Sequence, residues 1–218
     1  VEKYVKELQD KFINLAVRAS KKPVPFRMGT GKGKCTMNIN RRAEFADGSI
    51  WLGRAPDKPC DHDVTVTKFE DMSGKLLAVF INWPCHATTN GQDNYMITAD
   101  WPGAATRYIK KHTGEGTVVA VTAGASGDIN PIYGPGNDFR EIEGVGFHVG
   151  RTAWETYNSI ETMPVESLGA VSALMTFPGK KMTKDHFPQK EYEKGPDVEI
   201  GLIVFKIGHL ILTGISGE

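Results

Sequence analysis

Two apolar segments joined by one amphipathic helix constrain the fold of this chain most. Residues 76–82 and 117–122 are typical of buried strands. Residues 102–112 between them show helical spacing, and Asp100 stands ahead of the first turn. A helix that connects two strands of one sheet makes them parallel, so that both carboxyl ends lie at the same edge. The sequence therefore predicts a β-α-β unit, with Asp100 as the N-cap of its helix.

Further helical and strand-like segments flank this unit. The apolar spacing predicts helices over residues 2–20 and 139–160, and the turn at residues 70–75 predicts a hairpin. Strands are predicted over residues 25–28, 35–39, 64–69, 167–175, 197–206 and 209–214. We therefore expect an α/β (or α+β) class, a mixed sheet with flanking helices. The 218 residues are expected to be a single domain, and a fragment of a larger one, because the first residues already form a helical pattern.

The charge balance and the cysteines narrow the range of functions. Lysine plus arginine and aspartate plus glutamate number 26 each, so no net field favours nucleic acid. The partner is expected to be a small molecule or another protein. The three cysteines are odd in number and lack C-x-x-C spacing, which indicates neither a disulfide framework nor a cysteine zinc site.

Polar loops follow both strands of the predicted β-α-β unit. The first loop contains His86. The second, residues 123–138, contains Asp128 and is too rich in glycine and proline for a regular element. Because ligands bind at the carboxyl edge of such a sheet, we expect His86 to lie near residues 126–128. From residue chemistry alone, His86 is a metal ligand, a general base or a structural histidine, and Asp128 is equally able to hold only its own backbone.

Five segments of the chain carry a family pattern. In order they are MNINRRAE (37–44), VFINWPCHATTN (79–90), ITADWPG (97–103), ASGDINPIYG (125–134) and IGHLILTGISGE (207–218). Together they resemble motifs of the neutral, non-lysosomal ceramidases, in the same order and over nearly the whole chain. Each motif is short, but five in order indicate more than coincidence.

This resemblance implies a zinc amidase that hydrolyses the N-acyl bond of a ceramide-like lipid. By motif, His86 is the second of four Zn²⁺ ligands and Glu218 is the third, while a first histidine and a final tyrosine are expected outside this sequence. Imidazole and carboxylate suit Zn²⁺, and an open position accommodates water. The resemblance also implies contact with a membrane surface through the substrate, and a secreted or periplasmic location.

An arginine and a loop asparagine complete the implied site. Arg41 matches the arginine of the family's NINR motif and is expected to direct a polar group at the substrate, unless it is a surface residue paired with Glu44 or Asp47. Asn130 stands where the family has a serine. An asparagine amide is no such nucleophile, but it can donate a hydrogen bond to a developing oxyanion. Asn130, Asp128 and Arg41 are therefore the predicted catalytic residues, with zinc-activated water as the nucleophile.

The asparagine leaves two other functions open. One is a lipid-binding member of the family without catalysis, and the other is the same metal chemistry on a different substrate. Stoichiometric zinc would separate the first from the enzymes, and a panel of substrates would separate the two enzymes.

Other polar residues are expected to be structural. Residues 60–63 (CDHD) are expected to form a turn rather than a metal cluster. His209 is expected to be buried and hydrogen-bonded within a strand, and His148 to pack on the long helix.

Overall fold

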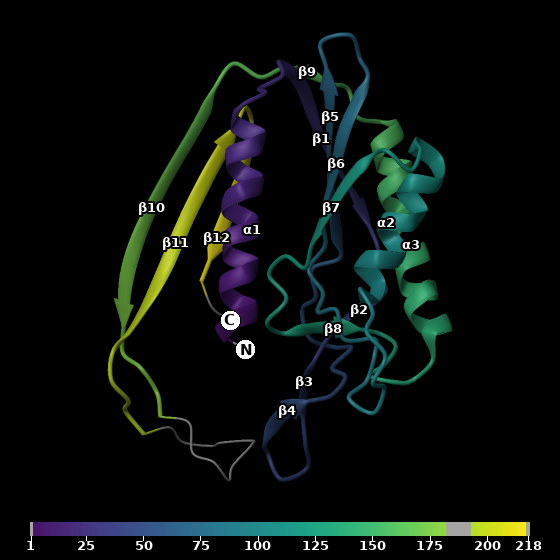
Figure 1. The fold of residues 1–218 in the computed structure, drawn as a ribbon. Coiled ribbons are helices and arrows are strands. Elements are labelled where there is room, and N and C mark those ends of the chain that lie inside the picture. The colour runs from purple at the N-terminus through teal and green to yellow at the C-terminus, as the bar shows by residue number, and fades with distance from the viewer. Residues whose placement is uncertain (1, 182–192, 217–218) are drawn as a thin grey trace.

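The computed structural model describes residues 2–181 and 193–216. The helices among these residues are α1 (Glu2–Ser20), α2 (Asp100–Thr113) and α3 (Phe139–Asn158). The strands are β1 (Phe26–Lys34), β2 (Asn38–Asn40), β3 (Arg42–Glu44), β4 (Ile50–Leu52), β5 (Asp63–Asp71), β6 (Leu76–Asn82), β7 (Val118–Thr122), β8 (Ile129–Pro131), β9 (Met163–Pro164), β10 (Leu168–Phe177), β11 (Val198–Ile207) and β12 (Leu210–Ile215). The predicted fold class is confirmed: α2 and α3 cover one side of a five-stranded sheet, and a three-stranded sheet lies on the other side (Figure 1).

The five-stranded sheet contains the predicted β-α-β unit. Its strand order is β7-β6-β5-β1-β9, and β6 and β7 are parallel while the other pairs are antiparallel. The prediction that both strands of the unit are buried is wrong for β7, where Val118 is 62% exposed. β7 is the edge strand, and of its two faces the one with Val119 and Val121 packs against the core, while Val118 lies on the other face.

Three glycines at alternate positions allow β1 to lie directly under α3. A Cβ at Gly33 would come within 2.5 Å of Thr156 Oγ1, and one at Gly31 within 2.9 Å of Thr156 Cγ2. A Cβ at Gly29 would come within 2.1 Å of a backbone oxygen. Because glycine has low strand propensity, the sequence predicts a strand only at residues 25–28, and packing against α3 fixes the rest.

The two helices of the outer layer approach each other closely, also through glycines. A Cβ at Gly146 of α3 would lie 2.2 Å from the Ala104 Cβ of α2, and one at Gly150 would lie 2.6 Å from the Tyr108 Cβ. The core between these helices and the sheet includes Val64, Val66, Val79, Ile81, Trp83, Trp101, Ile109, Val145 and Val149. This packing fixes the start of α2 against the end of β6.

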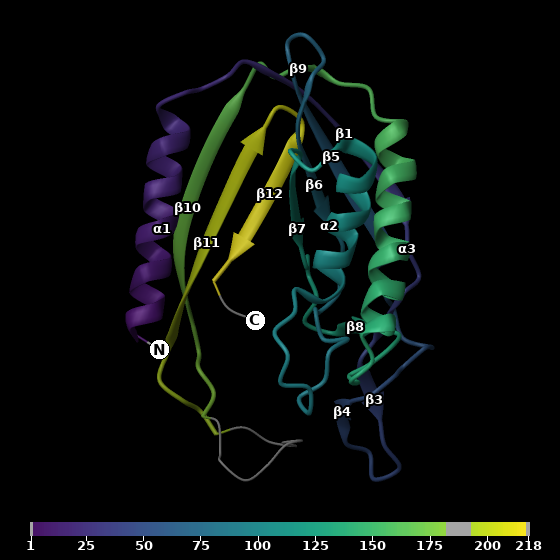
Figure 2. The same cartoon turned by 45° about the vertical axis from the view of Figure 1, so that its right-hand side comes forward.

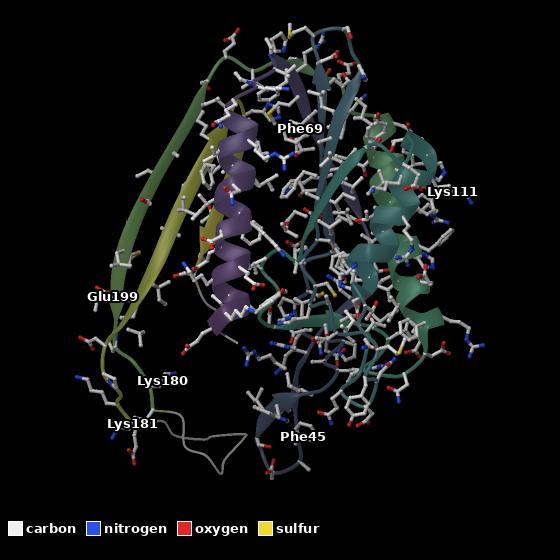
Figure 3. The ribbon with its side chains drawn as sticks, viewed as in Figure 1. Phe45, Phe69, Lys111, Lys180, Lys181 and Glu199 are labelled. Carbon is white, nitrogen blue, oxygen red and sulfur yellow. The ribbon has the colours of Figure 1, made fainter. Side chains whose placement is uncertain are left out.

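The three-stranded sheet and α1 are much more exposed. β10, β11 and β12 are antiparallel, and every residue of β10 is exposed. None of the residues of α1, all within the described part of the chain, is buried. Figure 2 shows α1 on the far side of the molecule from α2 and α3, and Figure 3 labels Lys180 and Glu199 near the ends of β10 and β11, opposite Lys111 of α2. None of the described helices is long and apolar enough to cross a membrane.

The prediction for His209 is wrong. The chain turns between β11 and β12 at Gly208, whose φ of +57° lies in the left-handed region, and His209 is exposed in that turn. The break between the two predicted strands was placed one residue too early, because a two-residue connection leaves little local signal besides its glycine.

A short antiparallel ladder crosses the second polar loop. β2 pairs with β8, and Ile39 lies opposite Asn130. The prediction that residues 123–138 hold no regular element is therefore wrong at residues 129–131. The ladder places Asn130 beside the end of β2, and so close to Arg41.

Candidate active site

The two polar loops meet where β6 and β7 end. The backbone N–H of Trp83 donates to Thr122 O (3.2 Å), that of Cys85 to Ala123 O (3.0 Å), and that of His86 to Ile129 O (3.2 Å). The loop after β6 is therefore hydrogen-bonded along its length to the loop after β7. The predicted proximity of His86 to the Asp128 loop is confirmed.

One carbonyl also fixes the imidazole of His86. The Nδ1 atom lies 3.1 Å from Ile129 O, the same oxygen that accepts the His86 backbone N–H. Because a carbonyl only accepts, Nδ1 carries the proton, and the lone pair of the neutral ring is on Nε2. A half-buried histidine held in this way has the tautomer that metal-binding histidines use.

Asn130 and Arg41, which the sequence places 89 residues apart, are in contact. Asn130 Oδ1 accepts hydrogen bonds from Arg41 Nη1 (3.3 Å) and Thr88 Oγ1 (3.4 Å). The Arg41 guanidinium also donates to Gly127 O from Nε (3.1 Å) and Nη2 (2.9 Å). Both acceptor bonds use the amide oxygen, and within the described chain Nδ2 of Asn130 makes no hydrogen bond. The amide oxygen of Asn130 is thus held by donors from two other segments of the chain.

Asp128 contributes to the site mainly by holding its loop. Its Oδ2 accepts from Asn40 Nδ2 (3.2 Å), and its carbonyl accepts from the Arg41 backbone N–H (2.7 Å). Asn40 is nearly fully buried and also donates to Pro59 O (2.9 Å). The carboxylate thus ties the second loop to the end of β2 through the side chain of Asn40, rather than through the backbone of its own loop.

The cysteine thiols near the site stay protonated at neutral pH. Burial, and then the charges of Asp128 and Asp61, raise the pKa of Cys60 to about 11. Burial also raises the pKa of Cys85 and of Cys35. Because the thiolate is the nucleophile and the metal ligand, a thiol with a raised pKa serves neither purpose well.

No complete metal site is found among the described residues. Within residues 2–181 and 193–216, no group of three or more histidine, cysteine, aspartate or glutamate side chains is placed to hold a metal ion. The predicted ligand Glu218 lies outside the described residues. At residues 60–63, Asp61 Oδ1 accepts the backbone N–H of Asp63 (2.9 Å), as in the predicted turn, and His62 Nδ1 bonds to Asn38 Oδ1 (2.5 Å).

The prediction that Asp100 caps α2 is wrong. The N-cap position is Ala99, with no side-chain capping bond, and Asp100 is the first helical residue. The Asp100 carboxylate instead accepts from the backbone N–H groups of Asn90 (2.8 Å) and Trp101 (2.7 Å). A carboxylate just before a helical pattern usually indicates an N-cap. The sequence does not reveal that the backbone N–H of Asn90, ten residues earlier, binds the same carboxylate.

Two residues that contribute to the site were not predicted from the sequence. Thr88 reaches Asn130, and the buried indole of Trp101 donates to His86 O (3.0 Å). The signal for Trp101 was available, because a buried tryptophan must find an acceptor for its N–H. Its partner was not predictable, since it lies in another loop.

Comparison with solved structures identifies the fold. The chain matches neutral ceramidase from Pseudomonas aeruginosa with a TM-score of 0.68 and 18% identity, covering 94% of this chain and 42% of that one. A ceramidase complexed with C2 matches equally well (TM-score 0.68, 17% identity, 90% of this chain and 42% of that one). The chain therefore has the fold of part of a neutral ceramidase.

A curated relative supports the same assignment. Neutral ceramidase A of Dictyostelium discoideum is 30% identical over 132 residues, which cover 56% of this chain and 18% of that protein. No family model matches the chain. The predicted resemblance is confirmed: the chain contains a region similar to part of neutral ceramidase, and it spans about a fifth of the length of that relative.

Proposed function

We propose that this chain is part of a zinc-dependent amidohydrolase that cleaves the N-acyl bond of ceramide-like lipids. The observation that carries the proposal is the convergence of His86, Asn130 and Arg41 at one sheet edge, within a ceramidase-like fold. These residues come from three separate motifs of the resemblance. Their contact is expected if the motifs serve one site.

His86 fits the role of a zinc ligand. Its Nδ1–H bond to Ile129 O directs the lone pair to Nε2, and neutral imidazole is a common ligand of Zn²⁺. By the resemblance, Glu218 is the third ligand, and a histidine and a tyrosine outside this sequence are the first and the fourth. When bound, zinc would polarise the substrate carbonyl and activate water.

Asn130 would stabilise the charge that develops on the substrate oxygen. Arg41 and Thr88 both bond to its Oδ1, so the amide plane is fixed and the Nδ2 donors are oriented before the substrate arrives. Donors fixed in this way stabilise an oxyanion without reorganisation. Arg41 would thus act through Asn130, and Asp128 would hold the loop that carries both the Gly127 acceptor and Asn130.

An apolar cavity at the same sheet edge suits a lipid chain. It has a volume of about 540 Å³ and lies between the two sheets. Its wall combines Phe80, Phe205, Ile211 and Leu212 with the polar Asn82 and Thr122 at the ends of β6 and β7. A cavity with an apolar wall and a few polar groups is typical of sites for amphiphilic small molecules, and it supports a lipid as the substrate.

Zinc content tests the proposal. In the full-length protein, we expect one zinc ion per chain, and His86→Ala should lose it as measured by elemental analysis. His112→Ala is the matched control, because His112 is exposed at the end of α2 and stacks on Trp154 (4.8 Å between ring centroids). Retention of one zinc by His86→Ala would refute the ligand assignment. Absence of zinc from the parent protein would favour a lipid-binding function without catalysis.

A further inference from the structure

The loop that carries His86 adopts its conformation at a cost. Within the described chain, four buried side-chain atoms have no hydrogen-bond partner, and three of them, Trp83 Nε1, Thr89 Oγ1 and Asn90 Oδ1, belong to this loop. Each buried polar group without a partner loses the bonds that it makes with water in the unfolded chain. A loop with three such groups keeps its shape only if strong contacts elsewhere hold it.

A strained residue provides those contacts. Asp100 has a φ of +50°, the only such value among the described non-glycine residues, and it is 4% exposed. Residues in the left-handed region are uncommon outside glycine, and they persist where the surrounding structure determines them. The N-cap residue of α2, Ala99, has no side-chain capping bond, and Asp100 accepts the N–H of Trp101 in the first turn while it also reaches outside the helix.

Asp100 and its neighbour hold both ends of residues 86–90. Asp100 Oδ2 accepts the Asn90 N–H (2.8 Å), and Oδ1 accepts the Trp101 N–H (2.7 Å). The Trp101 indole, fully buried and in edge-to-face contact with Trp83 (4.8 Å between centroids), donates to His86 O (3.0 Å). The carboxylate therefore joins one end of the segment directly and the other end through Trp101.

We propose that Asp100 is a positioning residue that fixes the orientation of His86 through residues 86–90 and Trp101. The consequence for zinc rests on the proposed function, whereas the effect on His86 itself does not. A carboxylate is needed because two N–H donors must be accepted at once. An amide has one acceptor oxygen, and its NH₂ group would face the second N–H.

Two substitutions separate positioning from stability. Asp100→Asn keeps the shape of the side chain and loses one acceptor. Asp100→Gly loses both acceptors but relieves the positive φ, which offsets part of the cost of the lost bonds. The control is Asp138→Ala, which removes a carboxylate from the start of α3, where it accepts the Arg140 N–H (2.9 Å) far from His86 in sequence.

The primary measurement is NMR of the ring nitrogens of His86 and of the Trp101 indole N–H. We expect both signals to shift in Asp100→Asn and Asp100→Gly and to stay in place in Asp138→Ala. In the full-length protein, the Kd for zinc should rise about 10-fold to 100-fold in both Asp100 variants, as is usual when a residue that orients a metal ligand is lost.

The results discriminate between the two proposals. Unchanged His86 and Trp101 signals in both Asp100 variants would overturn the positioning role. A Kd for zinc within twofold of the parent value in both variants would overturn its consequence for the metal. If the parent protein binds no zinc but the His86 signals still shift, the proposed function fails and the positioning role stands.

Discussion

A single added methyl group should distinguish two glycines of α3. At Gly146, a Cβ would lie 2.2 Å from the Ala104 Cβ and 2.8 Å from Trp101 O, whereas at Gly144 it would meet nothing within 4 Å. Glycine to alanine in an open helical position stabilises by up to about 1 kcal/mol. Forcing an extra methyl into a packed contact costs about 1–3 kcal/mol.

The two effects predict opposite signs. The contacts at Gly146 involve Cβ and backbone atoms of α2, which cannot rotate away, so the overpacking cost should lie near its upper limit. Gly146→Ala should therefore destabilise by about 2 kcal/mol net, or about 4–8 °C in melting temperature for a chain of this size. Gly144→Ala should raise the stability. Urea unfolding followed by tryptophan fluorescence measures both, and equal signs for the two variants would refute the close packing of α2 on α3.

Two further predictions concern the loops of the site. Asn130→Asp retains the oxygens that accept from Arg41 and Thr88 but removes the Nδ2 donors, so turnover of the full-length enzyme should fall about 100-fold to 1000-fold with zinc content unchanged. Asn130→Ser should keep or raise activity on ceramide. An Asn130→Asp enzyme as active as the parent would exclude the donor role. The Cys60 thiol, with its pKa raised to about 11, should react with iodoacetamide roughly 200-fold more slowly at pH 8 than an ordinary thiol. Because the unfolded chain releases this proton at lower pH than the folded chain, stability should decrease as the pH rises from 9 to 11. A reaction midpoint at or below pH 9 would contradict the raised pKa of the half-buried Cys60.

The sequence predicted those elements whose local pattern and tertiary environment agree. The β-α-β unit follows from two apolar strands and one amphipathic helix, and the turn at Gly74 (φ +87°) marks the hairpin between β5 and β6. β1 was predicted only in part, because its glycines oppose strand formation locally and only the contact with α3 explains them. The exposure of β7 depends on strand order, which no local pattern contains.

The sequence predicted which loops meet at the candidate site, but not which residues of these loops contact each other. Because both loops follow the carboxyl ends of parallel strands, His86 was predicted to lie close to residues 126–128. The contacts of the His86 backbone N–H and of Nδ1 with Ile129 O confirm this proximity. The bond between Arg41 and Asn130 depends on the short ladder of β2 and β8, and β8 lies in a segment without strand propensity. Asp100 accepts the N–H groups of both Asn90 and Trp101 in a backbone conformation with positive φ. Sequence patterns predict that conformation for glycine but not for aspartate.

If His86 belongs to a zinc site that hydrolyses an N-acyl bond, then hydrolysis must depend on zinc and on His86. Release of fatty acid from an N-acylsphingosine by the full-length protein is followed before chelation, after chelation and after zinc is restored, for the parent and for His86→Ala. We predict that the parent loses activity on chelation and regains it with zinc, and that His86→Ala is inactive in all three conditions. Hydrolysis that survives chelation, or a His86→Ala protein that hydrolyses at the parent rate, would contradict the account.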